Sequence, residues 1–239
     1  IKDIGGFVGG VLTGGRRCAS SVEGRQLITL DADYAGTDFW DIVEMFTDYA
    51  CCVYSTHKHT EDSPRLRLVI PVDRLVTVDE YQAIARKLAE DIGIDRFDDT
   101  TYEAHRLMYY PSASLDGPVV FKYRDCSILK ADTVLARYED WTDQASWPVS
   151  SRVDHIISKA MKKQEDPLEK HGIVGLFCRA YSVPEVIDEY LSDVYDPCKD
   201  GRYTFKAGST TGGAVVYEDK FLYSHHATDP CSMQLCNAF

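Results

Sequence analysis

The chain has 239 residues, of which 44% are hydrophobic and 27% charged, and its formal net charge is −12. These values are ordinary for a globular protein and allow one large domain or two small ones. The acidic balance excludes non-specific coating of nucleic acid, although a local basic groove stays possible, and no apolar run approaches the roughly 20 residues of a membrane helix.

Strand and helix patterns alternate along the first 140 residues. The glycine pairs at 5–15 predict short strand and turn pieces. The elements that follow are strands at 26–32, 51–54, 65–72, 107–110 and 119–123, a helix at 38–49 capped by Thr37, and a helix at 78–92 with a Thr77–Glu80 capping box and Gly93 at its end. The alternation predicts an α+β or α/β pattern.

The segment 139–150, with two Trp and a Pro, predicts a domain boundary. We therefore predict domains at 1–140 and 150–239. Helical patterns follow at 151–163, 166–181 and 182–195, the last with a capping box completed by Glu185. Residues 201–223 alternate like a small β-meander. The second domain is thus predicted to combine a helical cluster with a meander.

Two carboxylates stand at the end of the strand predicted at 26–32. Asp31 and Asp33 are one residue apart, so in a strand both side chains project from the same face. Neighbouring carboxylates repel each other unless a cation lies between them, and their hard oxygen atoms suit Mg²⁺ or Mn²⁺. The pair predicts a metal site for phosphate chemistry, with a turn or helix cap as the alternative.

The eight cysteines are scattered without a CxxC pair, which indicates reduced thiols of a cytosolic protein rather than a disulfide framework. His225, His226, Cys231 and Cys236 are side chains that zinc can bind, but their spacing fits no common zinc module. We therefore expect no structural zinc.

Three blocks of polar residues follow one another in the first half. They are Asp31-Ala32-Asp33, Ser55-Thr56-His57, and the stretch from Phe97 to Tyr110 with Asp98, Tyr102 and Arg106. In order and local character they resemble the three motifs of the archaeo-eukaryotic primase superfamily: a DxD pair, an SxH, and a hydrophobic residue then Asp, followed by a Tyr and an Arg. The sequence at 55–68 and the segment 224–230 are most similar to primase-polymerases of phages and plasmids, including those fused to virulence-associated E-type helicases.

The resemblance implies a fold and a reaction. The fold would be α+β, with an αβ unit plus an RRM-like unit in mixed sheets as catalytic core. The reaction would be template-dependent nucleotidyl transfer by a DNA primase-polymerase, with Asp31, Asp33 and Asp98 binding two Mg²⁺ or Mn²⁺ ions. His57, with Ser55 beside it, and Arg106 would bind phosphates of the incoming nucleotide. Asp99 stays an alternative to Asp98 as third ligand.

Basic residues also gather near the carboxylate pair in sequence, namely Arg16, Arg17, Arg25, Lys58, Arg65 and Arg67. Lys58, Arg65 and Arg67 would contact phosphates of template or primer, or form a solvated face. The tyrosines at 102, 109 and 110 are expected in the core or half-buried on a strand, with base stacking as the alternative.

The roles of the second half stay open. The helices at 151–195 would assist initiation of a primer or join the core to a helicase. His225, His226 and Asp229 would bind nucleotide or metal, or form a structural turn.

The implied partners are single-stranded DNA template, a primer, ribo- or deoxyribonucleotides and a helicase domain beyond Phe239, in the cytoplasm of a bacterial or phage-infected cell. Two other functions stay open. A rolling-circle initiator nuclease would use His57-Lys58-His59 and a tyrosine nucleophile such as Tyr81. A catalytically inactive module would only bind nucleic acid or nucleotide.

Overall fold

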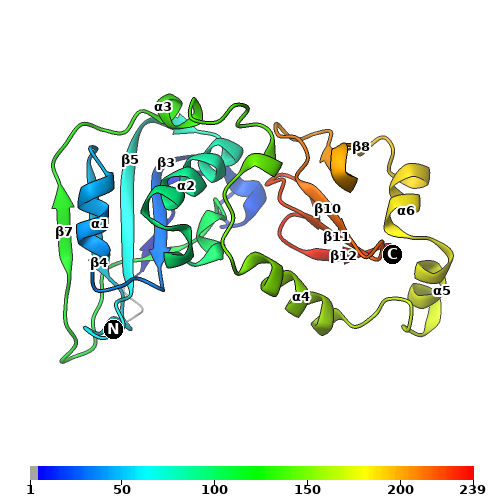
Figure 1. Ribbon diagram of the computed structural model, residues 1–239, viewed down its shortest axis with the longest axis horizontal. Coiled ribbons are helices and arrows are strands. Elements are labelled where there is room, and N and C mark those ends of the chain that lie inside the picture. Colours follow the sequence, from blue (N-terminus) through cyan, green and yellow to red (C-terminus); the bar gives the residue numbers. More distant parts are fainter. Residues whose placement is uncertain (1–4) are drawn as a thin grey trace. The chain divides into compact units, whose positions relative to one another are not determined.

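The computed structural model describes residues 5–239 and divides the chain into two compact units (Figure 1). Unit 1 comprises the described residues up to Glu139 together with Pro148–Ser150, and unit 2 comprises Asp140–Trp147 and Ser151–Phe239. Helices and antiparallel sheets occur in both units, so the predicted α+β class is confirmed.

Unit 1 is built on a five-stranded sheet with the order β2-β3-β5-β4-β7. Its strands are β2 Gly10–Leu12, β3 Val22–Ala32, β4 Cys51–Ser55, β5 Leu66–Val76 and β7 Phe121–Arg124. A separate pair joins β1 Gly6–Phe7 to β6 Met108–Tyr109. Every one of these pairings is antiparallel, whereas mixed sheets were expected. Between residues 5 and 239, parallel pairing occurs only as isolated bridges.

The two faces of this sheet differ in chemistry. Helices α1 Phe39–Phe46 and α2 Val78–Ile92 lie on one face, with the short α3 Ala131–Leu135 packed beside α2 (Figure 1). The residues Ile28, Leu30, Val53, Leu68 and Ile70 occupy alternate positions on the central strands and are fully buried. On the opposite face Asp31, Arg67 and Tyr54 lie directly across from one another on β3, β5 and β4. Because strand side chains alternate, one sheet provides both an apolar core and a polar row.

Local rules account for α2 and fail for α1. Helix α2 has the predicted bounds, the Thr77–Glu80 capping box and Gly93 at a φ of +107°. Helix α1 begins at Phe39, so its N-cap residue is Asp38 and not the predicted Thr37. The Asp38 carboxylate pairs with Arg96 and makes no capping hydrogen bond to the helix. It ends at Phe46, because Thr47 is extended and its hydroxyl donates to the Val43 carbonyl.

The capping box of α2 includes a third residue. The Thr77 hydroxyl accepts from the Glu80 N–H at 3.3 Å, and the Glu80 carboxylate accepts from the Thr77 N–H at 2.7 Å and from Arg74 at 2.6 Å. Burial alone raises the pKa of Glu80, but the hydrogen bonds from Arg74 and Thr77 outweigh it and hold that pKa below its usual range.

Replacing Thr77 by Ala is expected to lower the free energy of unfolding by about 1 kcal/mol near neutral pH, because the hydroxyl cap is lost. The cost of Glu80→Gln should instead depend on pH. A lowered folded-state pKa means that the carboxylate stabilises the fold above its unfolded-state pKa and loses this effect as pH falls through the folded-state value. Urea unfolding across the acid range measures both; a cost of Glu80→Gln that does not change with pH would contradict the ion pair.

Unit 2 contains three α-helices and a second five-stranded sheet among its described residues. The helices are α4 Val153–Gln164, α5 Gly172–Ala180 and α6 Val183–Tyr190. The sheet runs in sequence order through β8 Tyr195–Pro197, β9 Arg202–Phe205, β10 Ala214–Tyr217, β11 Phe221–Ser224 and β12 Leu235–Asn237. The predicted meander is thus correct and is longer by one strand at each end.

Helix α5 begins later than predicted. The predicted start near Asp166 is a turn, in which the Asp166 carboxylate accepts from the Leu168 N–H and pairs with Lys220 at 2.7 Å. Gly172 has a φ of +72°, which a continuous right-handed helix does not allow. The capping box of α6, with Ser182 and Glu185, is present as predicted.

Candidate functional site

A cavity of about 350 Å³ opens on the polar face of the unit 1 sheet. Its lining residues are Arg17, Asp31, Asp33, Thr56, His57, Lys58, Arg65, Arg67, Arg106, Leu107, Tyr109, Tyr110 and Ser112. Five of them are Arg or Lys and two are Asp, in a chain whose net charge is −12. This local excess of positive charge suits a polyanionic ligand such as a triphosphate.

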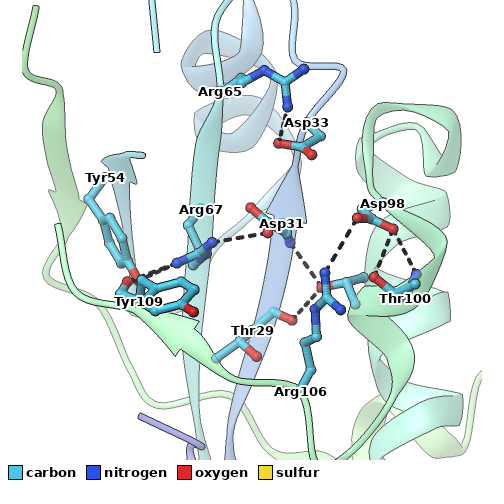
Figure 2. Close-up of polar contacts among 11 residues, drawn as sticks. Thr29, Asp31, Asp33, Tyr54, Arg65, Arg67, Asp98, Thr100, Arg106 and Tyr109 are labelled. Atoms are coloured by element: carbon cyan, nitrogen blue, oxygen red, sulfur yellow. Dashed lines mark hydrogen bonds and ion pairs between the residues drawn. The ribbon is translucent and has the colours of Figure 1, made fainter. Parts of the chain in front are cut away.

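The end of β3 brings both carboxylates of the first motif to this cavity (Figure 2). Asp31 lies opposite Arg67 in the β3–β5 register, and its Oδ2 is 3.0 Å from an Arg67 guanidinium nitrogen. One step beyond the strand, Asp33 Oδ1 is 2.8 Å from Arg65. The pairing of β3 with β5 therefore places one arginine beside each carboxylate.

Asp31 is the more buried of the two, with 8% of its surface exposed. Burial raises its pKa, the nearby Arg67 lowers it, and the charges of Asp33 and Asp98 add to the rise, so that the pKa lies above its usual range. Its second oxygen, Oδ1, is buried and has no hydrogen-bond partner. An unsatisfied buried carboxylate oxygen is costly, and either a bound cation or a hydrogen-bond donor would satisfy it.

Arg67 is itself held in place from several sides. Its Nη1 donates to the Tyr109 carbonyl at 2.8 Å and lies 3.5 Å from the Tyr54 hydroxyl, which donates to the same carbonyl at 2.9 Å. With 6% of its surface exposed, Arg67 fixes the orientation of Asp31 more directly than it offers a phosphate contact.

The third motif reaches the first through a short 3-10 helix, η3 Asp99–Tyr102. Strand β2 pairs with β3 at residues 22–25, so the edge along the C-terminal half of β3 is free to bond to other segments. The Asp31 N–H donates to the Thr101 hydroxyl at 2.9 Å, that hydroxyl donates to the Thr29 carbonyl at 3.0 Å, and the Asp98 N–H donates to the Asp31 carbonyl at 2.8 Å. These bonds set Asp98 beside Asp31.

The Asp98 side chain has two partners of its own. One oxygen accepts from the Thr100 N–H and hydroxyl, both at 2.9 Å, and the other lies 3.6 Å from Arg106. Asp98 is not among the residues lining the cavity, but its charge acts on Asp31. Asp99 accepts instead from the Ser150 hydroxyl at 2.5 Å.

The residues of the second motif separate at the end of β4. His57 lines the cavity, and its buried Nδ1 has no hydrogen-bond partner. Ser55 is 2% exposed, and its hydroxyl accepts from the Val120 N–H at 3.0 Å, outside the cavity lining. The structure therefore does not bring Ser55 to the cavity with His57, since the Ser55 hydroxyl joins β4 to the chain entering β7. Lys58 and Arg65 do line the cavity.

Several cavity residues were not assigned to the site from sequence. Arg17 lines the cavity and donates to the His105 carbonyl at 2.8 Å. Tyr109 and Tyr110 line it with 40% and 46% of their surface exposed, whereas Tyr102 is buried as expected. The basic run before β3 was the signal for Arg17. Arg25, the next basic residue along the chain, does not reach the cavity: it lies within β3 and is fully buried.

The residues of the alternative nuclease motif are engaged elsewhere. His59 is buried, and its Nδ1 accepts from the Arg65 N–H at 3.1 Å; burial lowers its pKa. Tyr81 is fully buried, and its hydroxyl donates to the carbonyls of Thr29 and Thr101. A nucleophile needs access to DNA, which Tyr81 lacks.

His226 has a structural role in unit 2. It is fully buried, and its Nε2 accepts from the N–H groups of Phe205 and Gly213 at 3.1 Å each. The ring proton of the neutral imidazole must therefore be on Nδ1, which donates to the Thr210 hydroxyl oxygen at 2.9 Å. Asp229 is also buried and accepts from the Tyr195 hydroxyl. Both residues belong to the turn after β11.

As the side chains stand, no three His, Cys, Asp or Glu residues between positions 5 and 239 are grouped to hold one metal ion. The donors that fit a cation are Asp31, through its unpartnered oxygen, and Asp33, which lines the same cavity. Across the same residues, no helix has the length and apolar character that crossing a membrane requires.

Residues 1–150 match the family model described as the VapE N-terminal domain. The chain belongs to this family. No curated protein and no solved structure matches the chain. The VapE N-terminal domain is consistent with a protein associated with phage or plasmid replication, and the matched segment includes every residue that lines the cavity.

Proposed function

We propose that unit 1 is the DNA primase-polymerase module of a phage- or plasmid-type replication protein, which makes and extends primers on single-stranded DNA. The observation that carries this proposal is the cavity itself. A carboxylate pair at a strand end, one oxygen of which is buried without a partner, lies among five basic side chains. Membership in the VapE N-terminal family supports a role in replication.

The residues divide into two groups by charge. Asp31 and Asp33, with Asp98 as the third carboxylate, would hold Mg²⁺ or Mn²⁺. Such ions activate a primer hydroxyl and stabilise charge on the triphosphate. Arg106 and His57 would bind the triphosphate by charge-assisted hydrogen bonds, and Arg67 would keep Asp31 oriented. Lys58 and Arg65, which also line the cavity, would contact phosphates of the template or primer. Asp98 is favoured over Asp99, because Asp98 adjoins Asp31 while Asp99 bonds to Ser150.

The test is incorporation of labelled nucleotide by the purified chain on a single-stranded template, with Mn²⁺ or Mg²⁺ and with a chelator. We expect metal-dependent products whose sequence follows the template. A covalent protein–DNA adduct without synthesis would favour the nuclease, and binding of nucleotide without turnover would favour an inactive module. Assays with ribo- and deoxyribonucleotides, with and without a primer, separate priming from extension.

Ser55 and His57 are expected to respond differently to replacement by Ala. His57→Ala should raise the KM for nucleotide about 10- to 100-fold, because a hydrogen bond to a charged phosphate contributes about 1.5–3 kcal/mol. Ser55→Ala should leave KM unchanged and cost about 1 kcal/mol of stability, because the Val120 N–H loses its acceptor.

Steady-state kinetics and urea unfolding of the two variants measure these effects. Thr133→Ala serves as the control for loss of a hydroxyl, because the exposed Thr133 hydroxyl donates to the Lys130 carbonyl and does not line the cavity. A raised KM in Ser55→Ala at unchanged stability would restore Ser55 to the nucleotide site.

Unit 2 has an accessory role in this proposal. Unit 2 would assist initiation or connect the module to a helicase domain, and the protein would act in the cytoplasm of a bacterial or phage-infected cell. Deleting residues 151–239 and comparing priming with extension separates the two roles of unit 2.

A further inference from the structure

Strand β7 carries two exposed aromatic side chains at the edge of the unit 1 sheet. Phe121 and Tyr123 are 62% and 66% exposed, and their ring centroids are 6.2 Å apart at an angle of 37°. They alternate with Lys122 and Arg124. Burying these rings would be favourable, so a sheet edge that leaves both exposed is an unusual arrangement for a solvated surface.

The strand register puts these rings on the face that bears the cavity. Phe121 lies opposite Tyr54, Tyr54 opposite Arg67, and Arg67 opposite Asp31, which makes one continuous row across four strands. Residues directly opposite in antiparallel strands project from the same face.

A second row and a contact on the other face agree with this placement. Tyr123 lies opposite Cys52, Cys52 opposite Val69, and Val69 opposite Thr29. The intervening Lys122 points the other way, with its ammonium 5.6 Å from the centre of the Trp40 ring on α1. In the first row, Phe121 on β7 and Asp31 on β3 are separated by three strand spacings of about 4.8 Å each, so the two residues stand about 15 Å apart.

We propose that Phe121 and Tyr123 form a base-stacking platform for single-stranded DNA on its way to or from the cavity. Successive bases of an extended strand can each stack on one ring, and stacking accepts any base. The basic cavity on the same face would hold the phosphates of the strand, and the charges of the cavity and of DNA are complementary. The platform deepens the proposed function and rests on it for the identity of the strand as a template.

The test is fluorescence anisotropy with a labelled single-stranded oligonucleotide of about 12 nucleotides, without nucleotide or metal. Phe121→Ala and Tyr123→Ala should each weaken binding about 5- to 150-fold, the range of one lost stacking contact. Phe121→Trp and Tyr123→Trp should keep the affinity. Phe46→Ala is the matched control, because Phe46 is 55% exposed on α1, which packs on the other face of the sheet, where Lys122 contacts Trp40.

An oligonucleotide with abasic positions separates stacking from a general loss of affinity. The wild-type chain should bind this oligonucleotide more weakly than the complete one. The double variant, with both Phe121 and Tyr123 replaced by Ala, should bind the two oligonucleotides equally. Unchanged affinity in both Ala variants, no binding by the wild-type chain, or equal loss in Phe46→Ala would overturn the platform.

Sedimentation velocity on the same samples tests a competing occupant, a second copy of this chain. Dissociation of a dimer by the Ala variants, with unchanged DNA affinity, would assign the edge to self-association and overturn the proposal. Because binding is measured without synthesis, its outcome is independent of the incorporation assay. An inactive chain with Phe121-dependent DNA binding would refute the polymerase and keep the platform.

Discussion

Replacing Asp33 by Asn is expected to lower the rate of template-directed incorporation by about three orders of magnitude, which corresponds to about 4 kcal/mol. Asp33 lines the cavity beside Asp31 and is only partly buried, so its carboxylate can be removed without leaving a buried charge unpaired. The amide keeps the size of the side chain and removes the negative charge that would bind a cation. Affinity for Mn²⁺, measured by isothermal titration in the presence of nucleotide, should fall with the rate.

Asp38→Asn is a matched control for this experiment. Asp38 pairs with Arg96 at 2.9 Å, much as Asp33 pairs with Arg65 at 2.8 Å, but it does not line the cavity. Both changes break a partly exposed ion pair, which contributes about 0–1 kcal/mol to stability. Equal melting temperatures with activity lost in Asp33→Asn alone are expected; full synthesis by Asp33→Asn would remove Asp33 from the site.

Replacing Arg25 by Met is expected to cost about 4 kcal/mol of folding free energy, the largest effect on stability among the changes considered. The fully buried guanidinium donates to the carbonyls of Gly9, Leu27 and Ala104 and to the Thr29 hydroxyl, at 2.6–3.3 Å, and lies 4.2 Å from the centre of the Tyr81 ring. Met fills similar space but donates no hydrogen bond. Several buried acceptors, most of them backbone atoms that no compensating mutation can remove, would then be unsatisfied.

Urea unfolding followed by circular dichroism measures this cost, and Arg25→Lys should fall between Met and wild type because an ammonium reaches fewer of the acceptors. Arg137→Met is the control, since Arg137 is partly exposed and pairs with Asp91 on the surface. A cost below about 1 kcal/mol for Arg25→Met would mean that the acceptors find other donors.

The features that the sequence predicts well are those decided by neighbouring residues. The capping boxes at Thr77 and Ser182 depend on atoms three residues apart, and both are present. The alternation in β3 likewise predicts that Asp31 and Asp33 share a face, and both line one cavity.

The features that sequence reasoning missed depend on distant partners. Ser55 bonds to Val120, 65 residues away, and Arg25 to Ala104, 79 residues away. Neither partner has a distinctive side chain, because a backbone N–H or carbonyl occurs at nearly every position. The same limit explains why Tyr109 could not be assigned to the cavity, since its carbonyl, not its ring, receives Arg67.

The junction between η3 and β3 has a consequence for the order of folding. Thr101 and Asp31 are joined across 70 residues of sequence, and the intervening chain includes α1, β4, β5 and α2. Contacts of such long sequence separation bear the loss of chain entropy for the whole loop and tend to form late. The first and third motifs should therefore come together only after the central sheet exists. Native-state hydrogen exchange should show the Asp31 and Asp98 amides opening together rather than one by one.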